Sequence, residues 1–154
     1  MTANWTDSDR QLMQSALAAA IEARNGGEVP VGAVVTIAGR IVGRGRNRTI
    51  GACDPSAHAE IVALREAATN RANHRLPDAT VFVTLEPCAM CLGALIQARV
   101  RRLVFGAYDP KAGAAGSVID LTNERRFNHR IETSGGLMAE ECGLLLSEFF
   151  ASRR

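Results

Sequence analysis

The 154-residue sequence lacks any apolar run long enough to cross a membrane as a helix. Its best candidate is interrupted by Arg99, Arg101 and Arg102, well short of the roughly 18 apolar residues that a membrane span needs. The first seven residues also lack the basic and apolar regions that secretory signals carry. We therefore expect a cytoplasmic protein that makes no contact with a membrane.

An excess of charge of either sign is also missing. Eighteen basic and 16 acidic residues give a net charge of +2, whereas proteins that coat DNA are usually far more basic, so no DNA partner is expected. Lys111 is the single lysine, and the other basic residues are arginines. Arginine binds phosphates and stacks on bases better than lysine. A GC-rich genome gives the same bias, however, so the arginine content by itself does not indicate RNA binding.

Internal repeats, low-complexity tracts and long linkers are absent too, which predicts a single domain over residues 1–154. The composition, 47% apolar and 22% charged, is that of a globular protein. A chain of this length buries roughly 70% of its unfolded surface, so its core needs no disulfide or metal to hold it.

Hydrophobic periodicity and turn residues predict alternating helices and strands. Thr6 and Asp9 mark a helix start, and Pro87 is placed in the first turn of a later helix. The expected elements are a helix over 6–25, strands over 31–37 and 41–46 joined at 38–39, a helix over 58–69, a strand over 80–85, a helix over 87–95, strands over 100–105 and 130–133, and a helix over 137–152. This order predicts a mixed sheet covered by helices on both faces, a three-layer α/β/α sandwich.

Four cysteines in a chain without an export signal favour metal binding or catalysis over disulfides. Cys88 and Cys91 are three residues apart at a predicted helix start, so both thiolates reach one ion and the helix N-terminus favours their charged form. His58 would complete a tetrahedral zinc site. Three protein ligands leave the fourth position to water, the pattern of a catalytic zinc.

Each of these residues has a simpler interpretation when taken alone. The cysteine pair could be a redox pair or plain buried residues, His58 a helix cap, and Glu60 an acid placed against a helix dipole. Cys53 could be a fourth ligand, which would make the zinc structural and leave Glu60 without a task. The combination is far less expected by chance: His-x-Glu is followed 27 residues later by Pro-Cys-x-x-Cys, the signature of zinc-dependent nucleobase deaminases.

From about residue 8 to residue 154 the chain resembles the bacterial tRNA-specific adenosine deaminases. The similar blocks are Val29-Pro30-Val31-Gly32-Ala33-Val34, Asn47-Arg48, Asp54-Pro55-Ser56-Ala57-His58-Ala59-Glu60-Ile61, Thr84-Leu85-Glu86-Pro87-Cys88-Ala89-Met90-Cys91, Val104-Phe105-Gly106-Ala107, Gly113-Ala114-Ala115-Gly116-Ser117, Asn128-His129-Arg130 and Phe149-Phe150. The zinc motif is shared with cytidine and guanine deaminases and does not select the base. The stretch after Phe105 and the Asn-His pair are the parts that indicate the tRNA enzymes.

The resemblance implies a cytidine deaminase-like fold with five strands, a homodimer and one Zn²⁺ per subunit. It also implies a hydrolase that acts on a cyclic amidine C–N bond, converting adenosine to inosine at the wobble position of an arginine tRNA with anticodon ACG. His58, Cys88 and Cys91 would hold the zinc, whose water would attack C6 of adenine. Glu60 would carry protons from that water to the ring nitrogen and then to the departing amine.

The substrate-binding residues implied by the resemblance have structural alternatives. For Asn47 the alternative is a turn at a strand end, for Asp109 a turn-forming role, and for Phe149 packing in the core. The others could be solvated or could cap local backbone. The full set of candidates is Asn47, Asp109, Lys111, Asn128, His129 and Phe149.

The expected partner is the anticodon stem-loop of tRNA, but two functions other than its deamination remain open. A free nucleobase deaminase, guanine deaminase foremost, would use the same zinc site. A zinc-stabilised module that only binds RNA would have no use for Glu60, which argues against it. An adenosine in a single-stranded loop is already partly unstacked, so a small protein can extrude it at little cost.

Overall fold

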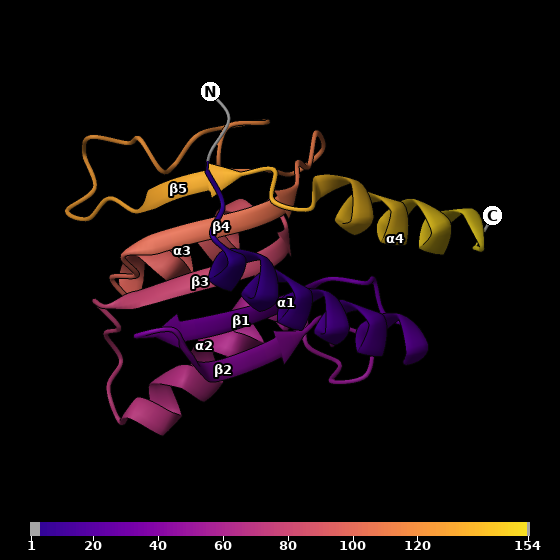
Figure 1. Cartoon of the computed structure of the whole chain (residues 1–154), viewed down its shortest axis with the longest axis horizontal. Coiled ribbons are helices and arrows are strands. Elements are labelled where there is room, and N and C mark those ends of the chain that lie inside the picture. Colours follow the sequence, from indigo (N-terminus) through magenta and orange to yellow (C-terminus); the bar gives the residue numbers. More distant parts are fainter. Residues whose placement is uncertain (1–3, 154) are drawn as a thin grey trace.

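A mixed five-stranded sheet with the order β2-β1-β3-β4-β5 forms the middle layer of the protein (Figure 1). The computed structural model describes residues 4–153, and residues 1–3 and Arg154 lie outside the described part. The elements are α1 (Asp7–Asn25), β1 (Gly32–Ile37), β2 (Arg40–Arg46), α2 (Ala59–Arg71), β3 (Ala79–Leu85), α3 (Ala89–Gln97), β4 (Arg102–Ala107), β5 (Glu132–Gly135) and α4 (Ala139–Ala151). None of the helices in residues 4–153 combines the length and the apolar character that a membrane crossing requires.

The sheet is antiparallel on one side and parallel on the other. β1 pairs antiparallel with β2 and β3, and β3, β4 and β5 run parallel to one another. Ala38 and Gly39 connect β1 to β2 with φ angles of 52° and 76°. Positive φ at both central residues is what a tight hairpin turn requires, so the predicted hairpin is confirmed.

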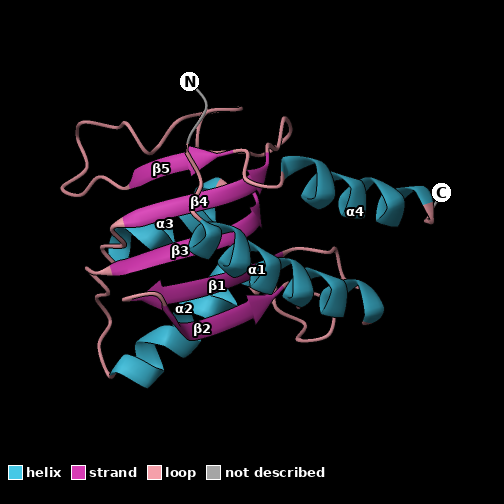
Figure 2. Ribbon diagram, in the orientation of Figure 1, coloured by secondary structure: helices cyan, strands magenta, loops and turns pink. Residues whose placement is uncertain are grey.

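Alternating strand residues form two separate cores. Val34, Phe82 and Val104 face α1 and α4, and the residues next to them in each strand face α2 and α3. Figure 2 shows the two pairs of helices on opposite sides of the sheet. Because successive side chains of a strand point to opposite faces, a strand covered on both faces is mostly apolar along its length, as β1 and β3 are. The predicted three-layer α/β/α sandwich is therefore confirmed.

Most of the predicted element boundaries hold within two residues, but that of α3 carries a correction. Pro87 does not lie in the first helical turn, because α3 begins at Ala89 and Cys88 is its N-cap. α1 begins as predicted: Thr6 and Asp9 form a reciprocal capping box, with the Asp9 N–H 2.9 Å from Thr6 Oγ1 and the Thr6 N–H 3.2 Å from Asp9 Oδ2.

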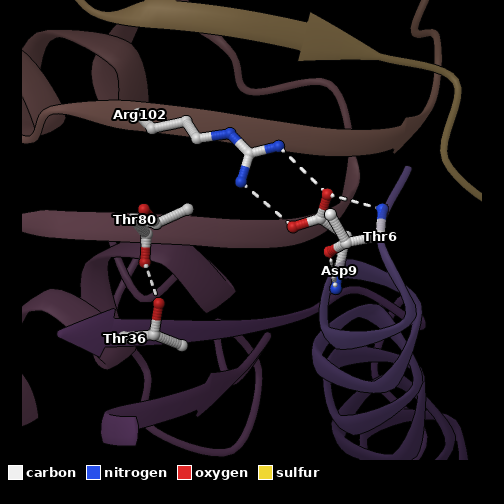
Figure 3. A network of polar contacts seen from close by, with 5 residues as sticks. All are labelled: Thr6, Asp9, Thr36, Thr80 and Arg102. Atoms are coloured by element: carbon white, nitrogen blue, oxygen red, sulfur yellow. Dashed lines mark hydrogen bonds and ion pairs between the residues drawn. The ribbon is translucent and has the colours of Figure 1, made fainter. Parts of the chain in front are cut away.

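The same aspartate also anchors α1 to the sheet (Figure 3). Arg102, the first residue of β4, donates two hydrogen bonds to the carboxylate of Asp9, at 3.0 and 3.2 Å. Nearby, the hydroxyl of Thr36 donates to the carbonyl oxygen of Thr80 over 3.2 Å. Because Thr36, Thr80 and Arg102 are paired in the sheet register, this group of contacts marks one end of the sheet, called here the far end.

Helix α2 lies unusually close to strand β2. A Cβ atom on Gly45 would come within 2.3 Å of the carbonyl oxygen of Ala59, and one on Gly43 within 2.3 Å of that of Ala63. Glycine on the strand and alanine on the helix thus let the two backbones approach each other. This packing fixes the N-terminus of α2 beside the end of β2.

Candidate active site

A pocket of about 310 Å³ opens at the end of the sheet where β3 finishes. Its size is at the lower limit for small-molecule sites, which suits a single nucleobase with part of its sugar. The N-termini of α2 and α3 and the ends of β2 and β3 converge on it. It is lined by Val29, Val31, Asn47, Thr49, His58, Ala59, Glu60, Leu85, Glu86, Cys88, Asp109 and Ala112.

The three predicted metal ligands lie together at this pocket. His58 is the N-cap of α2, Cys88 is the N-cap of α3, and Cys91 lies in the first turn of α3. His58 Nδ1 is 3.6 Å from Cys88 Sγ and 3.5 Å from Cys91 Sγ. All candidate ligand atoms of the three residues lie within 4.8 Å of one another. Two helix starts from distant parts of the chain therefore present one histidine and two cysteines to a single point.

These distances fit a tetrahedral zinc ion. With Zn–N near 2.05 Å and Zn–S near 2.3 Å, tetrahedral angles place the nitrogen and each sulfur about 3.6 Å apart. The two observed N···S distances, 3.6 and 3.5 Å, agree with that value. The donor set of one imidazole and two thiolates is also one that zinc prefers. The site can hold zinc without rearrangement of its ligands.

The pKa values of the two cysteine thiols shift in opposite directions. Hydrogen bonding between the two sulfurs lowers the pKa of Cys88 to about 5 and raises the pKa of Cys91, whose burial adds to the effect. One thiolate is thus formed readily at neutral pH. A divalent cation at this point would replace the remaining proton, because the thiolate is the form that binds metal.

Glu60 lies in the same pocket without being a member of the ligand group. It is the second residue of α2 and only 4% exposed. Burial raises the pKa of Glu60 to about 7, and charge on Cys88 adds to the shift. His58 and Glu60 would diverge inside a helix, but at the mouth of α2 both reach the pocket. A carboxyl with this pKa is suited to take up and release protons near neutrality.

Asn47 has a buried oxygen without a partner. Its Oδ1 makes no hydrogen bond within residues 4–153 although it is shielded from solvent, and the residue lines the pocket. Buried polar atoms almost always have partners, so an unpartnered acceptor on a residue that lines a pocket indicates a donor on a ligand.

Asp109 serves as a turn residue and also lines the pocket. Its Oδ1 accepts hydrogen bonds from the backbone N–H groups of Lys111 and Ala112, at 3.0 and 3.2 Å. Lys111 is exposed on the same loop and does not line the pocket. The structural alternative for Asp109 and its placement at the pocket are therefore both observed.

Three other candidates lie away from the pocket. The His129 ring contacts the carbonyl oxygen of Val100 over 2.6 Å, just before β4 begins at the far end of the sheet. Asn128 is its exposed neighbour in sequence. Phe149 is 6% exposed on α4 and packs against Phe150 and the guanidinium of Arg153, as core packing predicts.

The remaining cysteines also lie outside the metal group. Cys53 is exposed on the loop before α2 and is not among the clustered ligands. Cys142 is 1% exposed in the core between α4 and the sheet, as predicted.

Among the pocket residues without a predicted role, Glu86 is the one that carries a buried charge-bearing group. Glu86 follows β3 directly and is 2% exposed. The available signal was a carboxylate that directly follows an apolar strand and immediately precedes the Pro-Cys pair.

A mixed sheet whose pocket holds a His-Cys-Cys group and a buried glutamate defines the class of zinc-dependent deaminases with the cytidine deaminase-like fold. Residues 6–107 match the family model described as the cytidine and deoxycytidylate deaminase zinc-binding region. Within this class the chain belongs to the tRNA-specific adenosine deaminases. It is 49% identical to the tRNA-specific adenosine deaminase of Haemophilus influenzae over 97% of this chain and 87% of the relative.

Two solved structures allow the chain to be compared with both kinds of deaminase. One comes from a study of A-to-I editing by tRNA:A34 deaminases; it is 41% identical, with a TM-score of 0.86 over 88% of this chain and 99% of that chain. A guanine deaminase from Nitrosomonas europaea is 25% identical, with a TM-score of 0.78 over 97% and 87%. The chain is thus more similar to the tRNA deaminase in both sequence and fold.

Proposed function

We propose that this protein is a zinc-dependent hydrolase of the cytoplasm that converts adenosine to inosine at the wobble position of tRNA, with the arginine tRNA of anticodon ACG as its substrate. One observation carries the chemistry: the ligand atoms of His58, Cys88 and Cys91 lie within 4.8 Å of one another, and the buried carboxyl of Glu60 shares their pocket. The family to which the chain belongs carries the choice of substrate.

The proposal gives a role to each reactive side chain of the pocket. One zinc ion per subunit, held by His58, Cys88 and Cys91, would supply a nucleophile at neutral pH because it lowers the pKa of a water from 15.7 toward about 7. Glu60 takes one proton from that water and delivers it to the ring nitrogen as the oxygen bonds to C6. It then takes the second proton from the same oxygen and gives it to the amine, which leaves as ammonia while C6 becomes a carbonyl. Proton transfer of this kind contributes about 10² to 10⁴ in rate.

Asn47 orients the base. An asparagine amide can accept a hydrogen bond from the amino group of adenine and donate one to N7. The unpartnered Oδ1 of Asn47 supplies the acceptor. This contact holds the purine with its C6 toward the metal group, and Asp109 on the opposite loop lies next to the sugar.

The remaining RNA contacts come from two regions. Lys111 lies on the exposed loop and acts on nucleotides that flank the target, whereas Phe149 is buried on α4 and supports the exposed ring of Phe150 beside it. His129 and Asn128 lie near the far end of the sheet, about 20 Å from the pocket, given the seven residues of β3. A contact from these two residues therefore reaches parts of the anticodon stem-loop away from the reacting base.

A homodimer is the proposed assembly, and α3 is its proposed interface. The helix has nine residues, none of them charged. Met90 is 41% exposed, and nothing lies within 4 Å of the position of a Cβ on Gly93. An uncharged, open helix face of this kind is suited to a second copy of the chain. Sedimentation of the wild type and of Gly93→Arg tests it; a monomeric wild type contradicts it.

The decisive experiment is inosine formation in an ACG anticodon stem-loop. A GCG stem-loop and free guanine serve as controls, because guanine deaminase is the competing function. We expect conversion of the wobble adenosine alone, and its loss in Glu60→Ala. Consumption of guanine with intact RNA would keep the zinc chemistry and contradict the substrate. RNA binding that weakens with salt, without any conversion, would indicate a binding module.

A further inference from the structure

Glu86 is a buried carboxylate that the proposed chemistry does not use. It is 2% exposed, and none of the ion pairs within residues 4–153 includes it. A buried carboxylate needs hydrogen-bond partners to remain charged. The partners of Glu86 all come from one loop.

Four donors of the segment 109–117 surround this carboxylate. Oε1 accepts from the backbone N–H of Asp109 over 3.0 Å and from the hydroxyl of Ser117. Oε2 accepts from the backbone N–H groups of Ala115 and Ser117, over 3.0 and 3.1 Å. A single side chain thus holds both ends of the loop.

The loop is also shaped to approach Glu86 closely. A Cβ on Gly113 would lie 2.3 Å from the carboxyl carbon of Glu86, so any larger residue there would push the two apart. The N–H of Ala114 donates to the carbonyl oxygen of Pro87 over 2.8 Å. The absence of a side chain at Gly113 therefore leaves the space that the carboxyl group of Glu86 occupies.

Glu86 connects two parts of the pocket. It is two residues before Cys88, a proposed zinc ligand, and the loop that it holds carries Asp109 and Ala112, which also line the pocket. We propose that Glu86 is a positioning residue for substrate binding, an inference that rests on the proposed function. Through the loop 109–117, Glu86 sets the distance between the metal ligands and the wall of the pocket that receives the nucleotide.

Glu86→Gln tests this role because it keeps the shape of the side chain. An amide has one acceptor oxygen, so at least one backbone N–H of the loop would face an NH₂ group instead of an acceptor. We expect KM for the ACG stem-loop to rise about tenfold, with kcat within about threefold and with unchanged zinc content. Loss of binding shared by ground state and transition state has this signature.

A purely structural role gives a different result. It would lower the unfolding temperature or the zinc content of Glu86→Gln while KM per active site stays at the wild-type value, and this outcome would overturn the proposal. Asp9→Asn is the matched control: Asp9 is another buried carboxylate, 5% exposed, at the far end. We expect it to lower stability without a change in KM.

Ser117→Ala keeps the proposal testable if Glu86→Gln does not fold. Ser117 is exposed, so the variant should fold, and it removes one donor to Glu86. We expect KM to rise about threefold; an unchanged KM would overturn the proposal. If wild-type protein converts no RNA, the proposed function fails. If it converts RNA while both variants keep its KM, only the inference about Glu86 fails.

Discussion

The two ends of the sheet treat buried polar groups differently. At the far end each of them has a partner within the protein: Asp9 with Arg102, and Thr36 with the backbone of Thr80. At the pocket end, Asn47 Oδ1 has none within residues 4–153, and Glu60 is buried with its pKa raised to about 7. The buried carboxylate of Glu86 does have partners there, all of them in the loop 109–117.

The difference separates stability from chemistry. A satisfied buried pair stabilises one conformation, and its loss leaves a desolvated group without a partner. An unsatisfied group costs stability in the free protein and is retained where a ligand supplies the partner. Substitutions at the pocket end should therefore change activity more than stability, and those at the far end the reverse.

The largest effect is expected from the metal group. Cys91→Ser replaces a fully buried cysteine, a proposed zinc ligand, with a hydroxyl that zinc binds poorly, so the protein should lose its zinc and all measurable turnover. Metal analysis and inosine formation check this. The control is Cys53→Ser, which should keep both. Loss of zinc in that variant would mean that Cys53 is a ligand after all.

Glu60→Gln should come next. The amide keeps the size of the side chain but cannot carry a proton between water and base, so kcat should fall by about 10² to 10⁴. Zinc content and unfolding temperature should match or exceed those of the wild type, because a buried acid becomes neutral. Turnover near the wild-type value would remove Glu60 from the proton transfer.

Asn47→Ala would test the comparison most directly. Losing the amide that is proposed to hold the base should lower kcat/KM about 10- to 100-fold, the effect of about 1–3 kcal/mol. Stability should stay equal or rise, since the variant deletes a buried oxygen without a partner. Chemical denaturation and stem-loop kinetics give both values. A large loss of stability would show that Asn47 belongs with the far-end pairs.

Asp9→Asn should show the opposite pattern. The variant weakens two hydrogen bonds to Arg102, and we expect the free energy of unfolding to fall by about 1.5–3 kcal/mol. Both kcat and KM should remain at wild-type values, because the pocket lies at the other end of β3. A changed KM would contradict the independence of the two ends.

The smallest expected effect is the pH dependence of the stability that the Asp9–Arg102 pair contributes. Burial would raise the pKa of Asp9, but hydrogen bonds from Arg102 and Thr6 and the charge of Arg102 outweigh it and lower the pKa. The pair thus adds stability above about pH 3.9, the ordinary value of aspartate, and loses it as pH falls through the lowered pKa. The stability difference between wild type and Asp9→Asn should therefore shrink over this acidic range. Thermal unfolding of both proteins at each pH measures it. A constant difference would contradict it.

The sequence predicted well wherever local chemistry decides. The capping box at Thr6 and Asp9, the turn at Ala38-Gly39 and the helix start that holds Cys88 and Cys91 are each set within a few residues. The placement of Pro87 inside α3 was wrong, since the favoured position of proline in a first turn competes with the cap formed by Cys88. Glu86 was missed because its partners are more than 20 residues away.

What the sequence determined by itself is the inventory of reacting groups: a histidine, a nearby glutamate and two cysteines at helical spacing. Only the tertiary structure decided that these groups meet. Glycines on β2 let α2 approach, and the parallel β3 and β4 carry α3 to the same end of the sheet. It also divided the candidate RNA contacts, placing Asn47 and Asp109 in the pocket and His129 at the far end. The reason is physical: hydrogen bonds of caps and turns are local, whereas a pocket forms from segments that pack together only when the whole sheet assembles.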